Sequence, residues 1–191
     1  MLISLLKSAK AAAAVFISYH RARAQFPDLM LEFPCKFTFD DPEAIEMGRD
    51  ISIGPFSELV VLKRSPSSTV GGGLLLGNRC VIGAHANIRA CGGKIRIGQN
   101  ALLAQNVTLL AANHSLGTGA PYRDLPWDEE KTGVVIGENV WIGAGVTIVP
   151  GISIGNNSVV GAGSVVTRSI PVNELWAGVP ARKIRSLGLS A

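Results

Sequence analysis

Residues 136–165 read IGENVW IGAGVT IVPGIS IGNNSV VGAGSV, which are five consecutive blocks of six residues. Every block begins with Ile or Val, four of the five have glycine second, and the fifth position is small or β-branched. Glycine this frequent disfavours a helix, whereas one aliphatic and one small residue per block fit a short strand followed by a tight corner. Three such sides complete a triangular coil of about 18 residues, so the repeat predicts a parallel β-helix in which successive coils pair.

The same pattern extends toward the N-terminus, with a slip of three residues before residue 97. The block-opening residues are all aliphatic: Leu76, Ile82, Ile88, Ile97, Leu103, Leu109, Ile136, Ile142, Ile148, Ile154, Val160 and Val166. Stacking of coils predicts the pairs Ile136 with Ile154, Ile142 with Val160 and Ile148 with Val166. The fragment 53–59 keeps this phase and is expected to start the first coil. The stretch 65–73, rich in Ser and Gly, predicts a turn between coils.

The composition fits one domain with an aliphatic core. Of 191 residues, 47% are hydrophobic, 17% charged and only 6% aromatic, which excludes disorder as the main state. The net charge of +4 does not discriminate among an anionic small molecule, a membrane surface and nucleic acid as a partner. The cysteines Cys35, Cys80 and Cys91 contain no CxxC pair, so neither a disulfide framework nor a zinc cluster is indicated. A reducing, cytoplasmic location is the simplest expectation.

The first 24 residues predict an amphipathic helix, because apolar residues recur at three- and four-residue spacings with basic residues off that stripe. The stripe consists of Leu2, Leu5, Leu6, Ala9, Ala13, Phe16 and His20. Such a helix can cap the core, contact another subunit or lie on an anionic membrane surface. The apolar run 11–19 is shorter than the ~20 residues that a spanning helix needs. The expected organisation is a capping segment 1–49, a β-helix domain 50–186 with a protruding loop 115–135, and a tail 187–191.

Four motifs occur in order along the chain. Asn113-His114 precedes the long loop, the repeats 136–155 and 159–167 follow, and AGVPARKIR occupies 177–185. With this ordered set the chain resembles the hexapeptide-repeat acyltransferases, and within them the maltose, galactoside and nodulation O-acetyltransferase group. The resemblance implies an all-β, left-handed β-helix that forms a homotrimer with active sites between neighbouring subunits. It also implies acetyl-CoA as cosubstrate and no metal.

The catalytic expectation centres on His114. Imidazole is well suited to remove a proton from a hydroxyl near neutral pH. A histidine at the start of a loop is by itself more often structural, but the resemblance assigns His114 as the general base for attack of an acceptor alcohol on the thioester. The same resemblance assigns the Ala144 backbone N–H to the oxyanion that develops in the transition state.

The remaining site residues are also implied by the resemblance. Those expected along coenzyme A are Ala144, Ala162, Thr167 and Arg168, with Arg182 and Arg185 toward its phosphates. The alternative for the two terminal arginines is a solvated basic tail. On the acceptor side Asn113 and Trp141 are expected near the sugar or the thiol end of the cofactor, although Trp141 also suits a subunit contact. Asn87 and His85 compete for a further sugar contact, and Asn87 is favoured because an amide both donates and accepts hydrogen bonds.

These observations predict an acetyl-CoA-dependent O-acetyltransferase acting directly on a saccharide hydroxyl, for example of a surface polysaccharide or its precursor. One alternative is N-acetylation of a nucleotide-sugar amine, and another is a non-catalytic β-helix scaffold. A zinc site of the γ-type carbonic anhydrase kind is disfavoured, because the only histidines are His20, His85 and His114, and no two of them are five apart. No nucleic-acid partner is expected, and the N-terminal helix is the candidate for peripheral membrane contact.

Overall fold

Three parallel sheets wind around a shared core in the computed structural model, which describes residues 2–117 and 119–188, with side chains from residue 9. Helix α1 (Leu2–Gln25) precedes them. Sheet A contains β1 (Met30–Leu31), β4 (Ser52–Ile53), β7 (Val81–Ile82), β10 (Leu102–Leu103), β13 (Trp141–Ile142), β16 (Val159–Val160), β18 (Glu174–Gly178) and β19 (Ala181–Ser186). Sheet B contains β2 (Lys36–Phe39), β5 (Glu58–Leu62), β8 (Asn87–Cys91), β11 (Thr108–Leu110), β14 (Thr147–Ile148) and β17 (Val165–Val166). Sheet C contains β3 (Ile45–Met47), β6 (Gly73–Leu76), β9 (Lys94–Ile97), β12 (Val134–Ile136) and β15 (Ile152–Ile154).

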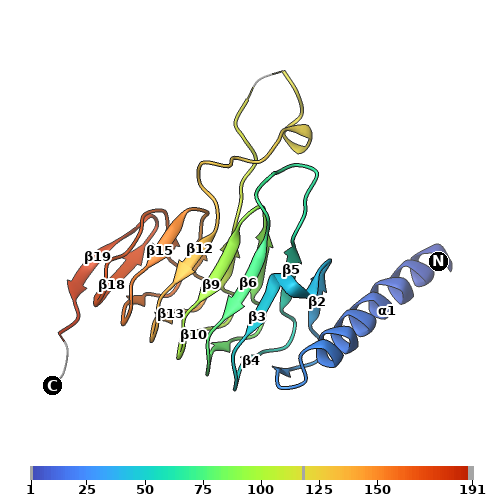
Figure 1. Cartoon of the computed structure of the whole chain (residues 1–191), viewed down its shortest axis with the longest axis horizontal. Coiled ribbons are helices and arrows are strands. Elements are labelled where there is room, and N and C mark those ends of the chain that lie inside the picture. Colours follow the sequence, from blue (N-terminus) through green and yellow to red (C-terminus); the bar gives the residue numbers. More distant parts are fainter. Residues whose placement is uncertain (1, 118, 189–191) are drawn as a thin grey trace.

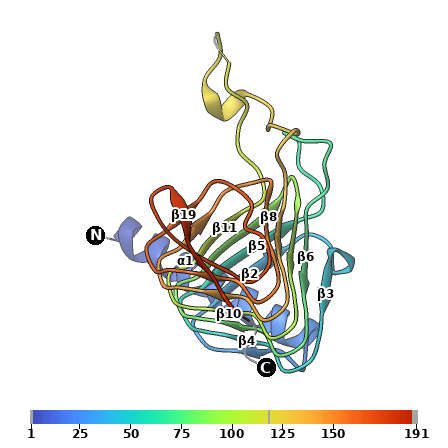
Figure 2. The ribbon, with the colours of Figure 1, turned by 90° about the vertical axis from the view of Figure 1, so that its left-hand side faces the viewer.

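The coils form a parallel β-helix, as the repeat predicted, and it is left-handed, as the resemblance implied. The chain visits sheets A, B and C in turn, and each strand pairs with the equivalent strand of the next coil. In the view from the C-terminal end, this path runs clockwise while the chain advances toward the viewer, which is a left-handed turn (Figure 2). Parallel crossovers are right-handed in nearly all other folds, so the handedness is an exception that periodicity does not reveal.

The core is the column of block-opening residues. All twelve of them are at most 3% exposed, and the three predicted stacked pairs are in register between neighbouring strands. The small or branched residues at the fifth position are buried as well, Cys80 and Val146 among them. Each coil therefore buries side chains from both positions against the coils above and below, which is how a solenoid stabilises itself.

The glycines at the second position of each block are needed because neighbouring coils approach closely there, not because the chain bends at them. A Cβ at Gly143 would lie 2.6 Å from the Ala162 backbone nitrogen in the next coil. The left-handed backbone at the corner between sheets C and A is supplied mainly by asparagines, for example Asn139 (φ 54°) and Asn157 (φ 58°). Asparagine tolerates this conformation better than most residues, and the two side chains are hydrogen-bonded to each other at 2.9 Å.

Helix α1 caps the open N-terminal end of the solenoid. The Ser18 hydroxyl donates to the Phe37 carbonyl (2.7 Å) and accepts from the Phe37 N–H (2.8 Å), so it satisfies an edge strand that would otherwise be unpaired. Tyr19 donates to the Leu31 carbonyl at 3.1 Å. The pairing of coils begins at Met30, upstream of residue 50 where the sequence pattern placed its start.

The predicted apolar stripe of α1 is not the face that contacts the solenoid. Ser18, Tyr19 and Ala22 face the first coil, whereas Phe16 is 55% exposed and His20 is also exposed. The part of the stripe formed by Leu2, Leu5 and Leu6 lies outside the described side chains. Within the part of the chain that the structure describes, no helix has the length and apolar character needed to cross a bilayer.

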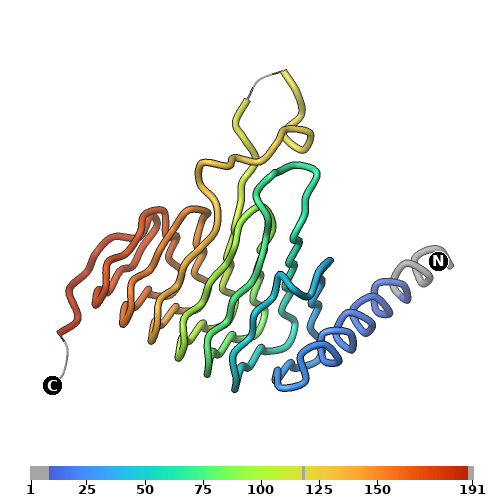
Figure 3. The backbone as a smooth tube through the Cα atoms, viewed as in Figure 1, coloured from blue at the N-terminus to red at the C-terminus, as the bar shows by residue number. Residues whose placement is uncertain are grey.

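Both interruptions of the coils leave from the corner between sheets B and C. The shorter, 63–72, connects β5 to β6, and the longer, 111–133, connects β11 to β12 and contains a 3₁₀ turn, η2 (Tyr122–Asp124) (Figures 1 and 3). The antiparallel hairpin of β18 and β19 closes the C-terminal end. Residues 189–191 of the expected tail lie outside the described residues.

Candidate active site

His114 lies at the start of the longer excursion, on a neck of two antiparallel segments. It pairs with Trp127, and on either side Asp128 N–H donates to the Asn113 carbonyl and Ser115 N–H to the Pro126 carbonyl, both at 2.9 Å. The neck holds the backbone of an otherwise exposed side chain in a defined position. His114 and Asn113, which the sequence placed together, are therefore presented by one structural element.

The imidazole of His114 is oriented by a backbone carbonyl. Its Nδ1 atom lies 3.4 Å from the Leu125 carbonyl oxygen. A carbonyl oxygen only accepts hydrogen bonds, so this contact favours the tautomer that carries its proton on Nδ1. The Nε2 lone pair is then free to accept a proton from a substrate, which is the arrangement that a general base requires.

The neck is anchored to the shorter excursion two coils below. Trp127 N–H donates to the Ser67 carbonyl at 2.8 Å. The Glu129 carboxylate accepts hydrogen bonds from the Thr69 N–H (2.6 Å), the Thr69 hydroxyl (2.9 Å) and the Ser68 hydroxyl (2.8 Å). These donors, the Thr69 N–H above all, lower the pKa of Glu129. The base of the protruding loop is thus fixed to the solenoid.

The Trp127 side chain fits against a glycine. Gly92 has φ 64°, and a Cβ placed there would lie 2.2 Å from Cε3 of Trp127. The indole therefore occupies the space that any larger residue at Gly92 would fill. This contact fixes the neck from the side of the solenoid, while Glu129 fixes it from the side of the shorter excursion.

A second group of expected site residues lines a groove on sheet A. Trp141, Ala144 and Ala162 surround a hollow of about 450 Å³ whose remaining walls are mostly aliphatic. Gly143 N–H donates to Val160 O, and Gly145 N–H donates to Gln105 O. Among the described residues the Ala144 N–H between them has no acceptor, so it is available to a ligand in the groove. The sequence placed these residues in one site, and the structure brings them together.

The groove and the histidine occupy different corners of the same chain. Ala144 and Ala162 follow sheet A strands at the corner between sheets A and B, whereas His114, Thr167 and Arg168 follow sheet B strands at the corner between B and C. Residues 106–111 of His114's own coil separate the two corners, and at about 3.3 Å per residue they span about 20 Å. One chain therefore does not bring the expected base to the expected oxyanion donor.

Asn87 belongs to a polar cluster on the outer face of sheet B. Its side-chain oxygen accepts from Arg89 Nε (2.8 Å), and Arg89 Nη2 donates to Glu58 (2.8 Å). Lys36 Nζ donates to the other oxygen of Glu58 at 2.7 Å. The Lys36 hydrogen bond, with the charge of Arg89, holds the pKa of Glu58 below its ordinary value. Glu58 was not predicted from the sequence, and its only signal there is its position one coil below Asn87.

His85, the competing acceptor residue, lies at the corner between sheets A and B. Its ring stacks on Phe56 with centroids 5.0 Å apart and 9° between the planes. Both residues have positive φ, 58° and 60°, and Phe56 is 60% exposed. The structure therefore gives His85 an aromatic partner and leaves the amide of Asn87 on the sheet face.

Arg182 and Arg185 project from the terminal hairpin beside the groove. Arg185 pairs with Leu175, which lines the groove, and both arginines are exposed. Lys183 between them is bound to Glu174, whereas among the described residues neither arginine is in an ion pair. The two arginines are thus available to an anion. In the same described ranges, no cluster of three or more His, Cys, Asp or Glu residues could hold a metal.

Comparison with known proteins gives matches to repeat models in two parts of the chain. Residues 133–168 match the bacterial transferase hexapeptide (six repeats), and residues 73–111 match the hexapeptide repeat of succinyl-transferase. Galactoside O-acetyltransferase from Escherichia coli K12 is 46% identical over 95 residues, which are 49% of this chain and 44% of that protein. The matched region spans about half the length of the curated relatives.

Solved structures extend the similarity over most of the chain. Maltose O-acetyltransferase from Clostridium difficile 630 has 31% sequence identity and a TM-score of 0.54, covering 84% of this chain and 67% of that one. A galactoside acetyltransferase in complex with coenzyme A has 29% identity and a TM-score of 0.54, covering 84% and 64%.

Proposed function

Because the chain belongs to the hexapeptide-repeat acyltransferase family, we propose that it transfers an acetyl group from acetyl-CoA to a hydroxyl of a saccharide. The names of the galactoside and maltose O-acetyltransferases support the class of acceptor, and the galactoside acetyltransferase structure in complex with coenzyme A supports the donor. The observation that carries the proposal is the pairing of two features: a histidine whose Nε2 is free to accept a proton, and an apolar groove with a free backbone N–H at Ala144.

The groove suits coenzyme A along its whole length. Its aliphatic walls can contact the pantetheine arm, and the unpaired Arg182 and Arg185 lie where an anionic end of the ligand would leave it. The thioester carbonyl would then accept a hydrogen bond from Ala144 N–H. Thr167 and Arg168, on another corner, are assigned to the same ligand as contacts from a neighbouring copy.

The transfer is direct. Nε2 of His114 takes the proton of the acceptor hydroxyl while the hydroxyl oxygen forms a bond to the thioester carbon. The carbonyl oxygen becomes an oxyanion, which the Ala144 N–H stabilises. When this intermediate collapses, the carbon–sulfur bond breaks, the acetyl ester remains on the sugar, and His114 returns its proton to the leaving thiolate. Asn113, Trp141 and the Asn87 cluster are proposed to hold the acceptor.

The active site requires two copies of the chain. Direct transfer needs the base, the hydroxyl and the thioester within about 3 Å of one another, whereas sheet B separates the two corners of one chain. Closed rotational symmetry can bring one corner of each copy against the other corner of the next. We therefore assign a homotrimer with three equivalent sites between subunits.

The compartment and the boundaries are part of the proposal. Cys35, Cys80 and Cys91 are free, and burial raises the pKa of Cys35 to about 12, which fits an unreactive thiol in a reducing cytoplasm. Within the expected segment 1–49 helix α1 is proposed to cap the chain, and the coils that follow it, up to residue 186, to carry the acyltransferase site.

The experiment is acetyl transfer from labelled acetyl-CoA to galactosides, maltose, a polysaccharide and an amino-sugar nucleotide. His114→Ala should abolish transfer to hydroxyls while leaving the thermal stabilisation by coenzyme A unchanged. His20→Ala, on the outside of α1, is the matched control and should behave as the native chain. Transfer to the amine alone would replace the hydroxyl acceptor by an amine. No stabilisation by millimolar coenzyme A, and no transfer, would leave a non-catalytic scaffold.

A further inference from the structure

The outer face of sheet C is hollowed beneath the two excursions, away from the groove on sheet A. One hollow of about 400 Å³ is lined by Lys94, Arg96, the end of the longer excursion and β12. A second, of about 440 Å³, shares Arg96 and continues toward the opposite edge of the sheet, where Glu46 lines it. The two together form a trough across the sheet, which we call the sheet C trough, with Arg96 in its middle.

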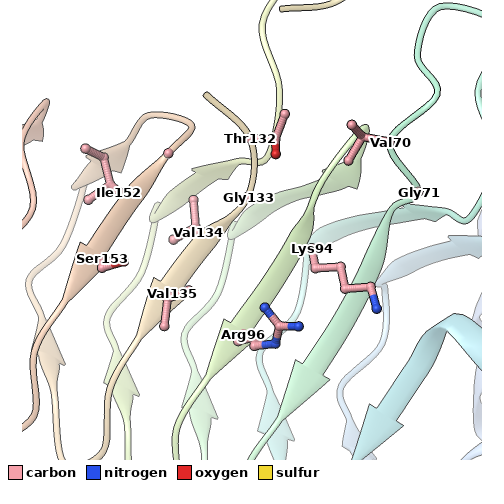
Figure 4. Close-up of a pocket in the computed structure, with 11 residues that line it drawn as sticks. Val70, Gly71, Lys94, Arg96, Thr132, Gly133, Val134, Val135, Ile152 and Ser153 are labelled. Atoms are coloured by element: carbon pink, nitrogen blue, oxygen red, sulfur yellow. The ribbon is translucent and has the colours of Figure 1, made fainter. Parts of the chain in front are cut away.

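The trough is hollow because its floor lacks side chains. Lys94 is flanked on one neighbouring strand by Gly73 and on the other by Gly133, and Gly151 follows Gly133 one coil further. Lys94 therefore stands alone in a row of glycines. The shorter excursion forms one wall, and Figure 4 shows Lys94 and Arg96 both rising from β9 into the space below it.

The neighbouring row of outward-facing side chains on sheet C combines a charged group with aliphatic surface. Arg96 stands in register between Leu75 and Val135, and Val135 is 40% exposed. A guanidinium binds a carboxylate through two parallel hydrogen bonds, whereas aliphatic side chains pack against the C–H faces of a sugar ring. A charged sugar therefore finds both kinds of contact in this row.

The electrostatics of the trough select an anion. No carboxylate lines the hollow next to the excursions, and among the described residues neither Lys94 nor Arg96 is in an ion pair. Lys63, by contrast, is neutralised by Asp41 at 2.6 Å. Two uncompensated positive charges on a concave surface attract a ligand that carries negative charge.

We propose that the sheet C trough is a second binding site, which holds a carboxylate-bearing segment of a glycan. Its shallow and elongated shape suits an extended chain rather than a compact molecule. Thr132 and Gly133 line the trough, and they end the same excursion that begins with His114 at the same corner. On the basis of the proposed function, the bound segment is part of the acceptor, and its hydroxyls lead toward His114.

The test measures binding without acetyl-CoA, by titration calorimetry at low salt, with an oligomer of galacturonic acid. A neutral malto-oligosaccharide of the same length is the control ligand, and Lys94→Gln with Arg96→Gln is the test variant. The matched control removes the same charge from the outside of α1, as Lys10→Gln with Arg23→Gln. Thermal unfolding of both variants verifies that they fold.

The uronic oligomer should bind the native chain and the control variant with the same affinity. Its affinity for the test variant should be about tenfold or more lower, and so should the affinity of the native chain for the neutral oligomer. Equal binding of both oligomers, equal weakening in both variants, or no binding would overturn the proposal. So would displacement of the oligomer by inorganic phosphate at a lower concentration than by galacturonate, because the site would then be a phosphate site.

This outcome is separable from that of the proposed function. Oligomer binding with no acetyl transfer to any acceptor would refute the transferase and leave the trough. Transfer to a monosaccharide without oligomer binding would refute the trough and leave the transferase.

Discussion

Replacing Gly92 by alanine would place a methyl group where the Trp127 indole lies. The added Cβ would be 2.2 Å from Cε3 and 2.6 Å from Cζ3, so the ring has to move. Trp127 is the residue that pairs with His114, and its N–H is bonded to Ser67. A displacement of the ring is therefore transmitted to the proposed general base.

The magnitude has two parts. Alanine at φ 64° costs about 1–2 kcal/mol, because the left-handed region crowds its Cβ. Overpacking against the indole adds about 1–3 kcal/mol, for a total of about 2–5 kcal/mol. Gly163 has φ 68° with nothing within 4 Å of an added Cβ, so Gly163→Ala should show the first part alone.

Two assays separate these effects. At about 2–4 °C per kcal/mol, Gly92→Ala should lower Tm by about 4–20 °C and Gly163→Ala by about 2–8 °C. A displacement of His114 by about 1 Å should reduce acetyl transfer by about 100-fold in Gly92→Ala. Equal Tm values for the two variants, together with native transfer by Gly92→Ala, would refute the role of the Trp127 contact.

Other predictions concern the groove, the core and the anchor. Arg182→Gln with Arg185→Gln should weaken coenzyme A binding about tenfold or more and reduce the salt dependence of that binding. Lys183→Gln should change the binding little, because Lys183 is already paired with Glu174. Calorimetry at two salt concentrations measures both effects. Ile142→Ala, at a position with 0% exposure, should lower the free energy of unfolding by about 2–5 kcal/mol in urea titration. The hydrogen bonds that Glu129 accepts lower its pKa in the folded chain. The contribution of Glu129 to stability is therefore complete above the unfolded pKa and is lost as pH falls through the folded pKa. Glu129→Gln should therefore lower Tm at pH 7, and the difference should disappear in acid; a difference independent of pH would contradict this.

The solenoid was predictable wherever the six-residue period is intact, because the residues that repeat are the residues that stack. The first coil was missed for a local reason. Leu31 and Phe37 are six apart, as are Met47 and Ile53, but the 3₁₀ turn η1 (Pro42–Ala44) inserts extra residues between Phe37 and Met47. The insertion breaks the phase, so the period did not extend back to Met30.

The candidate site was predictable only in part. Trp141, Ala144 and Ala162 lie in equivalent blocks of neighbouring coils, so the period itself brings them into one groove. The anchoring of Trp127 and Glu129 joins irregular segments whose conformation has no repeat, and nothing in their sequence indicates the contacts. His114 is separated from the groove because the two lie at different corners of the solenoid, after strands of different sheets.

The central claim is that each active site combines His114 of one copy with the groove of another. Coexpression of His114→Ala chains with Ala162→Trp chains, whose groove is blocked, tests it directly when the mixed assembly is isolated with two affinity tags. Each variant alone should be inactive. Every mixed trimer has three such interfaces, and one of them joins an intact histidine to an intact groove, so about a third of native transfer should return. Mixed trimers as inactive as the two parents would contradict a site shared between copies.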